Sequence, residues 1–122
     1  MESKHSFLKS FVFAFEGLWT GFWKGRNFRV QVVLGVAAVI LAVLLKLSTT
    51  EWVLLLLTIN FVLMLELINT SIEAVVDLVS PEIREKAKVA KDTAVAAVLI
   101  SSIFSILIAC FLFLPKIFNL VI

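Results

Sequence analysis

The feature that most constrains this chain is a series of three apolar stretches, each at least about as long as a membrane is thick. They are residues 28–47, 52–79 and 93–114. A helix needs about 20 apolar residues to cross the hydrocarbon core of a bilayer. Charged residues make up 16% of the 122 residues, against about 25% in an average soluble chain. The sequence therefore predicts an all-α integral membrane protein with three transmembrane helices.

The first 27 residues predict a different kind of helix, with aromatic side chains at every fourth position and polar ones between them. The aromatic positions are Phe7, Phe11, Phe15, Trp19 and Trp23. This pattern is typical of an amphipathic helix in the membrane interface. Gly17, Gly21 and Gly25 share a four-residue spacing that lets helices approach closely. We expect an interfacial helix over residues 1–27, within one domain that spans residues 1–122.

Short polar segments predict where the helices begin and end. One of residues 48–50 is expected to cap the second transmembrane helix, because Ser and Thr are favoured N-caps. Ser80 and Pro81 are typical of an N-cap and a first helical position. The loop 80–92 is therefore expected to hold a short helix of its own. Pro115 is expected to end the third transmembrane helix.

The distribution of basic residues predicts the orientation in the membrane. Five of the eleven lie near the N-terminus and four lie between residues 80 and 92. By the positive-inside rule, both segments are cytoplasmic and the C-terminus is outside. The net charge of +2 is too small to indicate nucleic-acid binding. His5 is expected to be solvated, and the single cysteine, Cys110, excludes an intramolecular disulfide.

A row of polar side chains interrupts the end of the second apolar stretch, in "ELINTSIEAVVD" at residues 66–77. At about 100° per residue, Glu66, Asn69, Glu73 and Asp77 fall within about 80° of one helix face. A charge at mid-membrane costs roughly 2.5–3.5 kcal/mol on insertion scales, so the row requires cations or a wet cleft. Two structural explanations remain open. The helix emerges into water here, or the first two residues join helices by hydrogen bonds.

The functional interpretation is a site for a metal ion and phosphates. Carboxylates suit Mg²⁺, which binds one or two of them together with substrate phosphates. Phosphoryl transfer requires the metal, positive charge and a positioned base. Lys88 and Lys91 follow closely enough in the chain to fold back over the polar face. Arg26 and Arg29 are candidates for binding phosphates or lipid headgroups, or they belong to the positive-inside pattern. The chain has no P-loop motif.

The string "ELINTSIEAVVD", followed by "AKVAKDTAVAAV", resembles the prokaryotic diacylglycerol kinase family, which includes the undecaprenol kinases of Gram-positive bacteria. The resemblance covers nearly the whole chain. It implies a homotrimeric kinase of the bacterial cytoplasmic (inner) membrane. Such a kinase uses ATP and Mg²⁺ to phosphorylate a lipid alcohol, undecaprenol or diacylglycerol, at the cytoplasmic interface. The N-terminal sequence resembles the undecaprenol kinase branch more closely than the Gram-negative diacylglycerol kinase branch.

The resemblance also implies roles for individual residues of the two strings. Glu66 corresponds to the catalytic base, and Glu73 corresponds to a metal ligand. The residues implied to bind the nucleotide or line its site are Asn69, Asp77, Lys91 and Asp92.

One position departs from the family pattern. Gly25 stands where the family usually has a glutamate that is a second metal ligand. Glu16 is nine residues earlier, roughly 180° around a helix, and is a poor substitute. Either Glu73 and ATP oxygens hold the metal alone, or another carboxylate replaces the missing one, or the chain is a weakly active or inactive relative. A small ion-coupled transporter is a further alternative, because intramembrane carboxylates mark ion pathways.

Overall fold

The computed structural model describes residues 6–82 and 84–122, and this part of the chain contains four α-helices and no strand. The helices are α1 (Phe7–Lys24), α2 (Arg26–Leu44), α3 (Thr49–Val79) and α4 (Glu85–Val121). Residues 1–5, which include His5 and the start of the predicted interfacial segment, lie outside the described residues. In the described part, α2, α3 and α4 are long and apolar enough to cross a membrane. The prediction of an all-α membrane protein with three such helices is confirmed.

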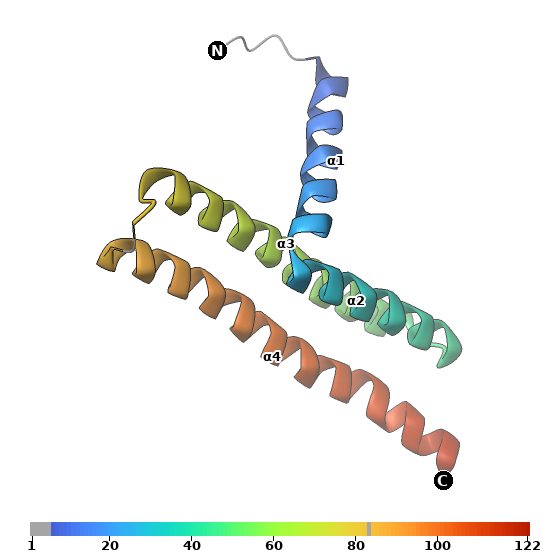
Figure 1. Cartoon of the computed structure of the whole chain (residues 1–122). Coiled ribbons are helices and arrows are strands. Elements are labelled where there is room, and N and C mark those ends of the chain that lie inside the picture. The colour runs from blue at the N-terminus through green and yellow to red at the C-terminus, as the bar shows by residue number, and fades with distance from the viewer. Residues whose placement is uncertain (1–5, 83) are drawn as a thin grey trace.

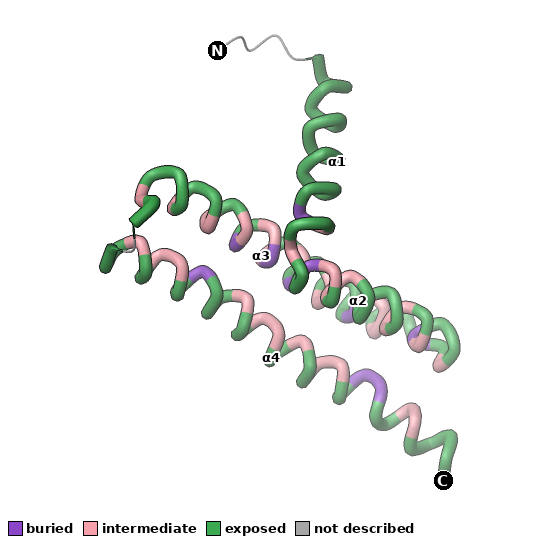
Figure 2. The backbone as a smooth tube through the Cα atoms, viewed as in Figure 1, coloured by how far each residue is buried: buried purple, intermediate pink, exposed green. Residues whose placement is uncertain are grey.

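The three long helices lie side by side, and α1 leaves them at a steep angle (Figure 1). Buried positions lie on the inner faces of the long helices, and the outer faces are exposed (Figure 2). These exposed faces carry mainly Leu, Val, Ile and Phe, as expected where hydrocarbon rather than water surrounds the helices. A cluster of buried side chains holds together the end of the bundle that contains the turn between α2 and α3: Ala42, Leu47, Leu55, Leu112 and Phe113.

The turn between α2 and α3 is closed by a capping box, which confirms the predicted cap within residues 48–50. The Ser48 hydroxyl accepts from the Glu51 N–H at 3.3 Å, and Glu51 Oε1 accepts from the Ser48 N–H at 2.8 Å. The backbone N–H groups of Ser48 and Glu51, which have no carbonyl partner within the helix, thereby gain hydrogen bonds. Lys116 Nζ lies 3.1 Å from Glu51 Oε1 and ties α4 to the same turn. Within the turn, Lys46 adopts a positive φ of 57°.

Two predicted helix boundaries are wrong. Ser80 is the C-cap of α3 rather than the N-cap of a short loop helix, and α4 begins at Glu85 after the N-cap Arg84. The segment from 85 onward continues without a break because its first turns are rich in Ala and Lys, which are strong helix formers. Pro115 lies inside α4 and does not end it. Proline is tolerated within transmembrane helices where neighbouring groups satisfy the freed carbonyl.

The capping box predicts a measurable stability difference. Replacing Ser48 with Ala removes the acceptor for the Glu51 N–H and is expected to lower the unfolding free energy by about 1 kcal/mol. Thr50→Ala is the matched control, because Thr50 is exposed and its side chain makes no hydrogen bond in the described structure. Unfolding in mixed detergent micelles measures both variants. Equal losses at the two positions would contradict the capping role.

Candidate active site

The polar row on α3 begins with two buried residues. Glu66 is 3% exposed and Asn69 is 7% exposed. No hydrogen bond or ion pair reaches the Glu66 carboxylate from the described residues, and Asn69 Oδ1 is buried there without a partner. Emergence into water therefore does not explain these two positions. Neither side chain bonds to another helix within one chain, so the second structural explanation is not supported either.

The row becomes more exposed toward the C-terminal end of α3. Asn69 Nδ2 donates to Glu73 Oε1 at 3.5 Å, and Glu73 is half-buried. The Glu73 carboxylate interacts electrostatically with both Glu66 and Lys91. Asp77, one turn further on, is exposed. One helix face thus leads from a buried, unpaired carboxylate to an exposed, paired one.

The turn between α3 and α4 brings basic side chains to the exposed end of this row. Lys91 Nζ lies 2.5 Å from Asp77 Oδ1, and Lys88 pairs with Asp92 one helical turn along α4. These four side chains line a cavity of about 250 Å³ together with residues of the turn. An ion pair as exposed as that between Lys91 and Asp77 contributes little stability. Lys91 can therefore exchange its carboxylate partner for a phosphate at small cost.

The two arginines near the start of α2 have different surroundings. Arg29 Nη1 donates to the carbonyl oxygens of Phe22 and Trp23, at 3.0 and 2.8 Å. Its guanidinium thereby closes the C-terminal end of α1, a role that the sequence did not indicate. Arg26 is exposed and makes no hydrogen bond or ion pair with the described residues. Of the two, Arg26 is the one available to an anionic group.

Gly25 forms the junction between α1 and α2. Its N–H donates to the Gly21 carbonyl oxygen at 2.9 Å, and a Cβ built on Gly25 would lie 2.7 Å from that same oxygen. No side chain fits at Gly25 without a shift of the backbone. Gly21 is buried, and a Cβ there would meet Leu67 Cδ2 at 2.7 Å, whereas Gly17 has open space around it. The predicted close helix contact thus occurs at Gly21, between α1 and α3.

The described residues contain no group of three or more His, Cys, Asp or Glu side chains able to hold a metal ion. One chain does offer two neighbouring oxygen atoms that can ligate a metal ion: a Glu73 carboxylate oxygen and the unpartnered Asn69 Oδ1. This set fits Mg²⁺, which takes few protein ligands and completes its coordination with water and phosphate oxygens. Glu16 is exposed on α1, which diverges from the bundle (Figure 1).

Comparison with known proteins agrees with this geometry. The family described as prokaryotic diacylglycerol kinase matches residues 12–113, a range that contains the polar row and the lysines facing it. The chain belongs to this family. Its members are lipid kinases, so the chain is a multi-pass membrane enzyme of a bacterial family of lipid kinases.

Individual relatives carry two different names. An undecaprenol kinase of Bacillus subtilis (strain 168) is 40% identical over 110 residues, which are 90% of this chain and 89% of the relative. A diacylglycerol kinase of Synechocystis sp. (strain ATCC 27184 / PCC 6803 / Kazusa) is 40% identical over 116 residues, 94% of this chain and 66% of the relative. A diacylglycerol kinase of Escherichia coli (strain K12) is 33% identical over 105 residues, 86% of each chain.

The junction at Gly25 predicts a position-specific effect of a single methyl group. Gly25→Ala is expected to lower the unfolding free energy by about 1–3 kcal/mol, as overpacking typically does. Gly17→Ala is the matched control and is expected to cause no loss, because space is open there and Ala favours a helix. Unfolding in detergent micelles gives both values, and the fluorescence of Trp19 and Trp23 reports displacement of α1. A stable Gly25→Ala variant with unchanged fluorescence would contradict the steric role of Gly25.

Proposed function

We propose that the chain transfers a phosphoryl group from ATP, with Mg²⁺, to the hydroxyl of a membrane lipid alcohol at the cytoplasmic interface. The observation that carries the proposal is the arrangement along α3. A buried carboxylate without a partner, Glu66, lies on the same face as Glu73 and the Asp77–Lys91 pair. A lipid hydroxyl approaches the buried end from the bilayer, and a nucleotide approaches the exposed end from water.

In the proposed mechanism, Glu66 accepts the proton of the lipid hydroxyl. Its carboxylate makes no hydrogen bond or ion pair in the described structure, so both oxygens are available to a hydroxyl donor. The lipid oxygen then attacks the γ-phosphorus in line, and ADP leaves. Mg²⁺ supplies neutralisation of the charge on the phosphate oxygens when it is bound. Proton acceptance and charge neutralisation are thus assigned to opposite ends of one helix face.

The basic and amide side chains bind the phosphates in this proposal. Lys91 leaves Asp77 and pairs with a phosphate oxygen, and Asp92 holds Lys88 at the edge of the same cavity. Glu73 and Asn69 Oδ1 provide oxygen ligands for the metal, and Arg26 provides a further cation. Positioning and charge stabilisation account for most of the catalysis in phosphoryl transfer.

The placement in the membrane and the assembly are also part of the proposal. We place the N-terminus and the turn between α3 and α4 in the cytoplasm, because nine of the eleven basic residues lie there by sequence. We infer a homotrimer and a single kinase domain over residues 1–122 from the family resemblance. The names of the relatives do not choose between undecaprenol and diacylglycerol. Gly25 favours weaker metal binding than in a family member with a glutamate at that position.

The proposal predicts a loss of turnover without a comparable loss of nucleotide binding in Glu66→Gln. The amide keeps the size of the side chain and cannot accept the proton, and general-base catalysis contributes roughly 10²–10⁴-fold. Purified protein in detergent, with radiolabelled ATP, Mg²⁺ and undecaprenol or diacylglycerol, measures lipid phosphate. Glu85→Gln is the control, because Glu85 is exposed and makes no ion pair in the described structure.

Two outcomes would overturn this assignment. Absence of lipid phosphate from both lipids at high enzyme load would reject the kinase function of this chain. Proton-coupled flux in liposomes without ATP would then favour the transporter alternative. Parallel losses of turnover and nucleotide binding in Glu66→Gln would reject the role of Glu66 as the base.

A second prediction concerns the cation at the exposed end of the row. Lys91→Ala is expected to raise the KM for ATP about tenfold, because a hydrogen bond to a charged group contributes about 1.5–3 kcal/mol. The unfolding free energy should change little, since the ion pair with Asp77 is exposed. Lys86→Ala is the control, as Lys86 is exposed and has no ion-pair partner among the described residues. Equal KM values for the two variants would remove Lys91 from the nucleotide site.

A further inference from the structure

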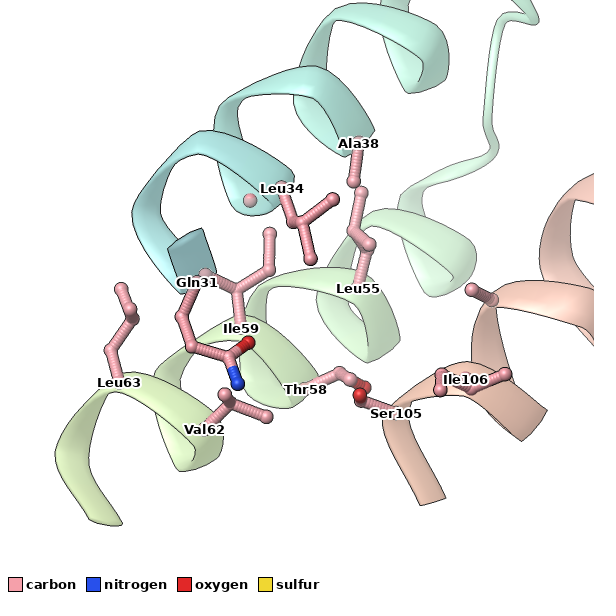
Figure 3. A pocket seen from close by; sticks show the side chains of 12 residues that line it. Gln31, Leu34, Ala38, Leu55, Thr58, Ile59, Val62, Leu63, Ser105 and Ile106 are labelled. Atoms are coloured by element: carbon pink, nitrogen blue, oxygen red, sulfur yellow. The ribbon is translucent and has the colours of Figure 1, made fainter. Parts of the chain in front are cut away.

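A groove lies between α2, α3 and α4 within the predicted membrane region. It has a volume of about 250 Å³, and its walls are almost entirely apolar. In Figure 3, Leu34 and Ala38 of α2 face Leu55 and Ile59 of α3, and α4 forms the remaining side with Ser105 and Ile106. Leu34 and Ile106 are exposed, so the groove is open to the surrounding bilayer. None of the residues assigned above to the reaction lines it.

The groove lies on the same face of α3 as the proposed catalytic base, Glu66. At about 100° per residue, the groove-lining positions Leu55, Ile59 and Val62 fall within about 40° of Glu66 on the α3 face. With a rise of 1.5 Å per residue, Val62 is about 6 Å and Leu55 about 16 Å from Glu66 along the helix axis. The helix face that carries the polar row therefore continues into the membrane region as a row of apolar side chains. The groove begins about one turn beyond Glu66.

The walls of the groove are built to keep it narrow. A Cβ on Gly35 would lie 3.3 Å from Ile59 Cγ2, so α2 and α3 approach closely there. At the end nearer Glu66, Gln31 Nε2 donates to Ser102 Oγ at 3.3 Å and links α2 to α4. A second apolar cavity adjoins the first at Thr58 and Ser105, but its other α3 residues, such as Leu57 and Phe61, are turned away from the face of Glu66. Of these two cavities, the first shares the face of Glu66.

We propose that this groove holds the hydrocarbon chain of the lipid alcohol, and that it favours a single-chain prenol over a two-chain glyceride. The inference rests on the proposed kinase function. Its volume is below the roughly 300–1,000 Å³ of sites that enclose drug-sized ligands, so it accommodates a segment of one chain. A second chain would have to remain outside in the bilayer.

The groove orients the lipid for the reaction. It does not gain binding free energy by removing the lipid chain from water. Lipid tails are as apolar as the groove, so moving a chain from bilayer to protein yields little free energy. Packing against fixed helix faces instead directs the hydroxyl at the head of the chain toward Glu66. A well-oriented hydroxyl contributes to the rate by proximity. Chain packing and proton acceptance are thus coupled along one face of α3.

Two adjacent alanines on α2 provide the test. Ala38 lines the groove, and Ala37 is exposed on the same helix and does not line it. Ala38→Phe should fill the groove and lower kcat/KM for a long prenol about tenfold or more, as a steric change in an apolar pocket does. It should leave the turnover of a ten-carbon prenol, which extends past Val62 but is too short to reach the level of Leu55 and Ala38, within about twofold. Ala37→Phe should leave both values unchanged.

The outcomes separate failure of this inference from failure of the kinase function. A wild-type protein that phosphorylates no lipid alcohol rejects the function itself. An active wild type, with Ala38→Phe unchanged on the long prenol, rejects the groove. Equal losses on long and short prenols also reject it. Dissociation of the oligomer by Ala38→Phe, measured by light scattering in detergent, would show that a second copy occupies the groove. A higher kcat/KM for diacylglycerol than for the long prenol would overturn the chain preference.

A measurement independent of activity keeps the test valid if Ala38→Phe folds poorly. A long prenol with a photoreactive diazirine near the middle of its chain is added to wild-type protein in micelles and irradiated. Mass spectrometry should find the label on the groove segments of α2 and α4, around residues 34–38 and 105–109, and an excess of unlabelled prenol should remove it. Labelling that extends equally to exposed α2 positions outside the groove, such as Val43 and Leu44, and that is insensitive to the excess, would reject the groove.

Discussion

The structure depends on the scarcity of polar groups that can be placed within a membrane. Helices satisfy their own backbone groups, which is why helices span bilayers. Several polar side chains in the long helices have hydrogen-bond partners within their own helix or on a neighbouring one. The Thr58 and Ser71 hydroxyls donate to carbonyl oxygens four residues earlier, and Gln31 donates to a serine. Glu66 and Asn69 break this pattern. They are buried, and each presents an oxygen that no described donor reaches.

Such unsatisfied groups are costly, and their cost is tolerated where a ligand is to satisfy them. The Asn69 amide is turned so that its nitrogen contacts Glu73 and its oxygen is buried without a described partner. At the exposed end of the face the situation is reversed, since Asp77 and Lys91 neutralise each other. In the proposed mechanism, a phosphate at Lys91 therefore has to displace Asp77. This competition keeps the cationic site neutral until an anion arrives.

Much of the fold follows from local sequence signals. Three apolar stretches were sufficient to predict α2, α3 and α4, and the period of 3.6 residues placed four polar residues on one face. Ser48 was recognisable as a cap because its chemistry is local. The prediction at Ser80 was wrong because proline follows a helix C-cap as readily as it begins a helix. The prediction at Pro115 was wrong because transmembrane helices tolerate proline inside them. The pairing of Lys91 with Asp77 was predicted as proximity alone, since its geometry depends on how the turn closes.

Other features depend on contacts between segments and had no local signal. Arg29 fits the positive-inside pattern, yet its guanidinium is bound to the carbonyls that end α1. The glycine series predicted one continuous ridge, but Gly17, Gly21 and Gly25 have three different surroundings. Gly25 departs from the family pattern at the position where the chain bends. Its lack of a side chain therefore has a steric reason, and in the proposed function it leaves the metal with one carboxylate fewer.

The length of α3 has a consequence for where the two substrates meet. Its 31 residues extend about 46 Å, whereas the hydrocarbon core is about 30 Å thick. Counted from Thr49, the core is crossed after about 20 residues, which places its second boundary, the cytoplasmic one in the proposed orientation, near Asn69. By this count, Glu66 lies just inside the hydrocarbon core, and Glu73 and Asp77 lie on its aqueous side. On such a helix a lipid need not leave its leaflet and a nucleotide need not enter it, because the phase boundary itself crosses the site.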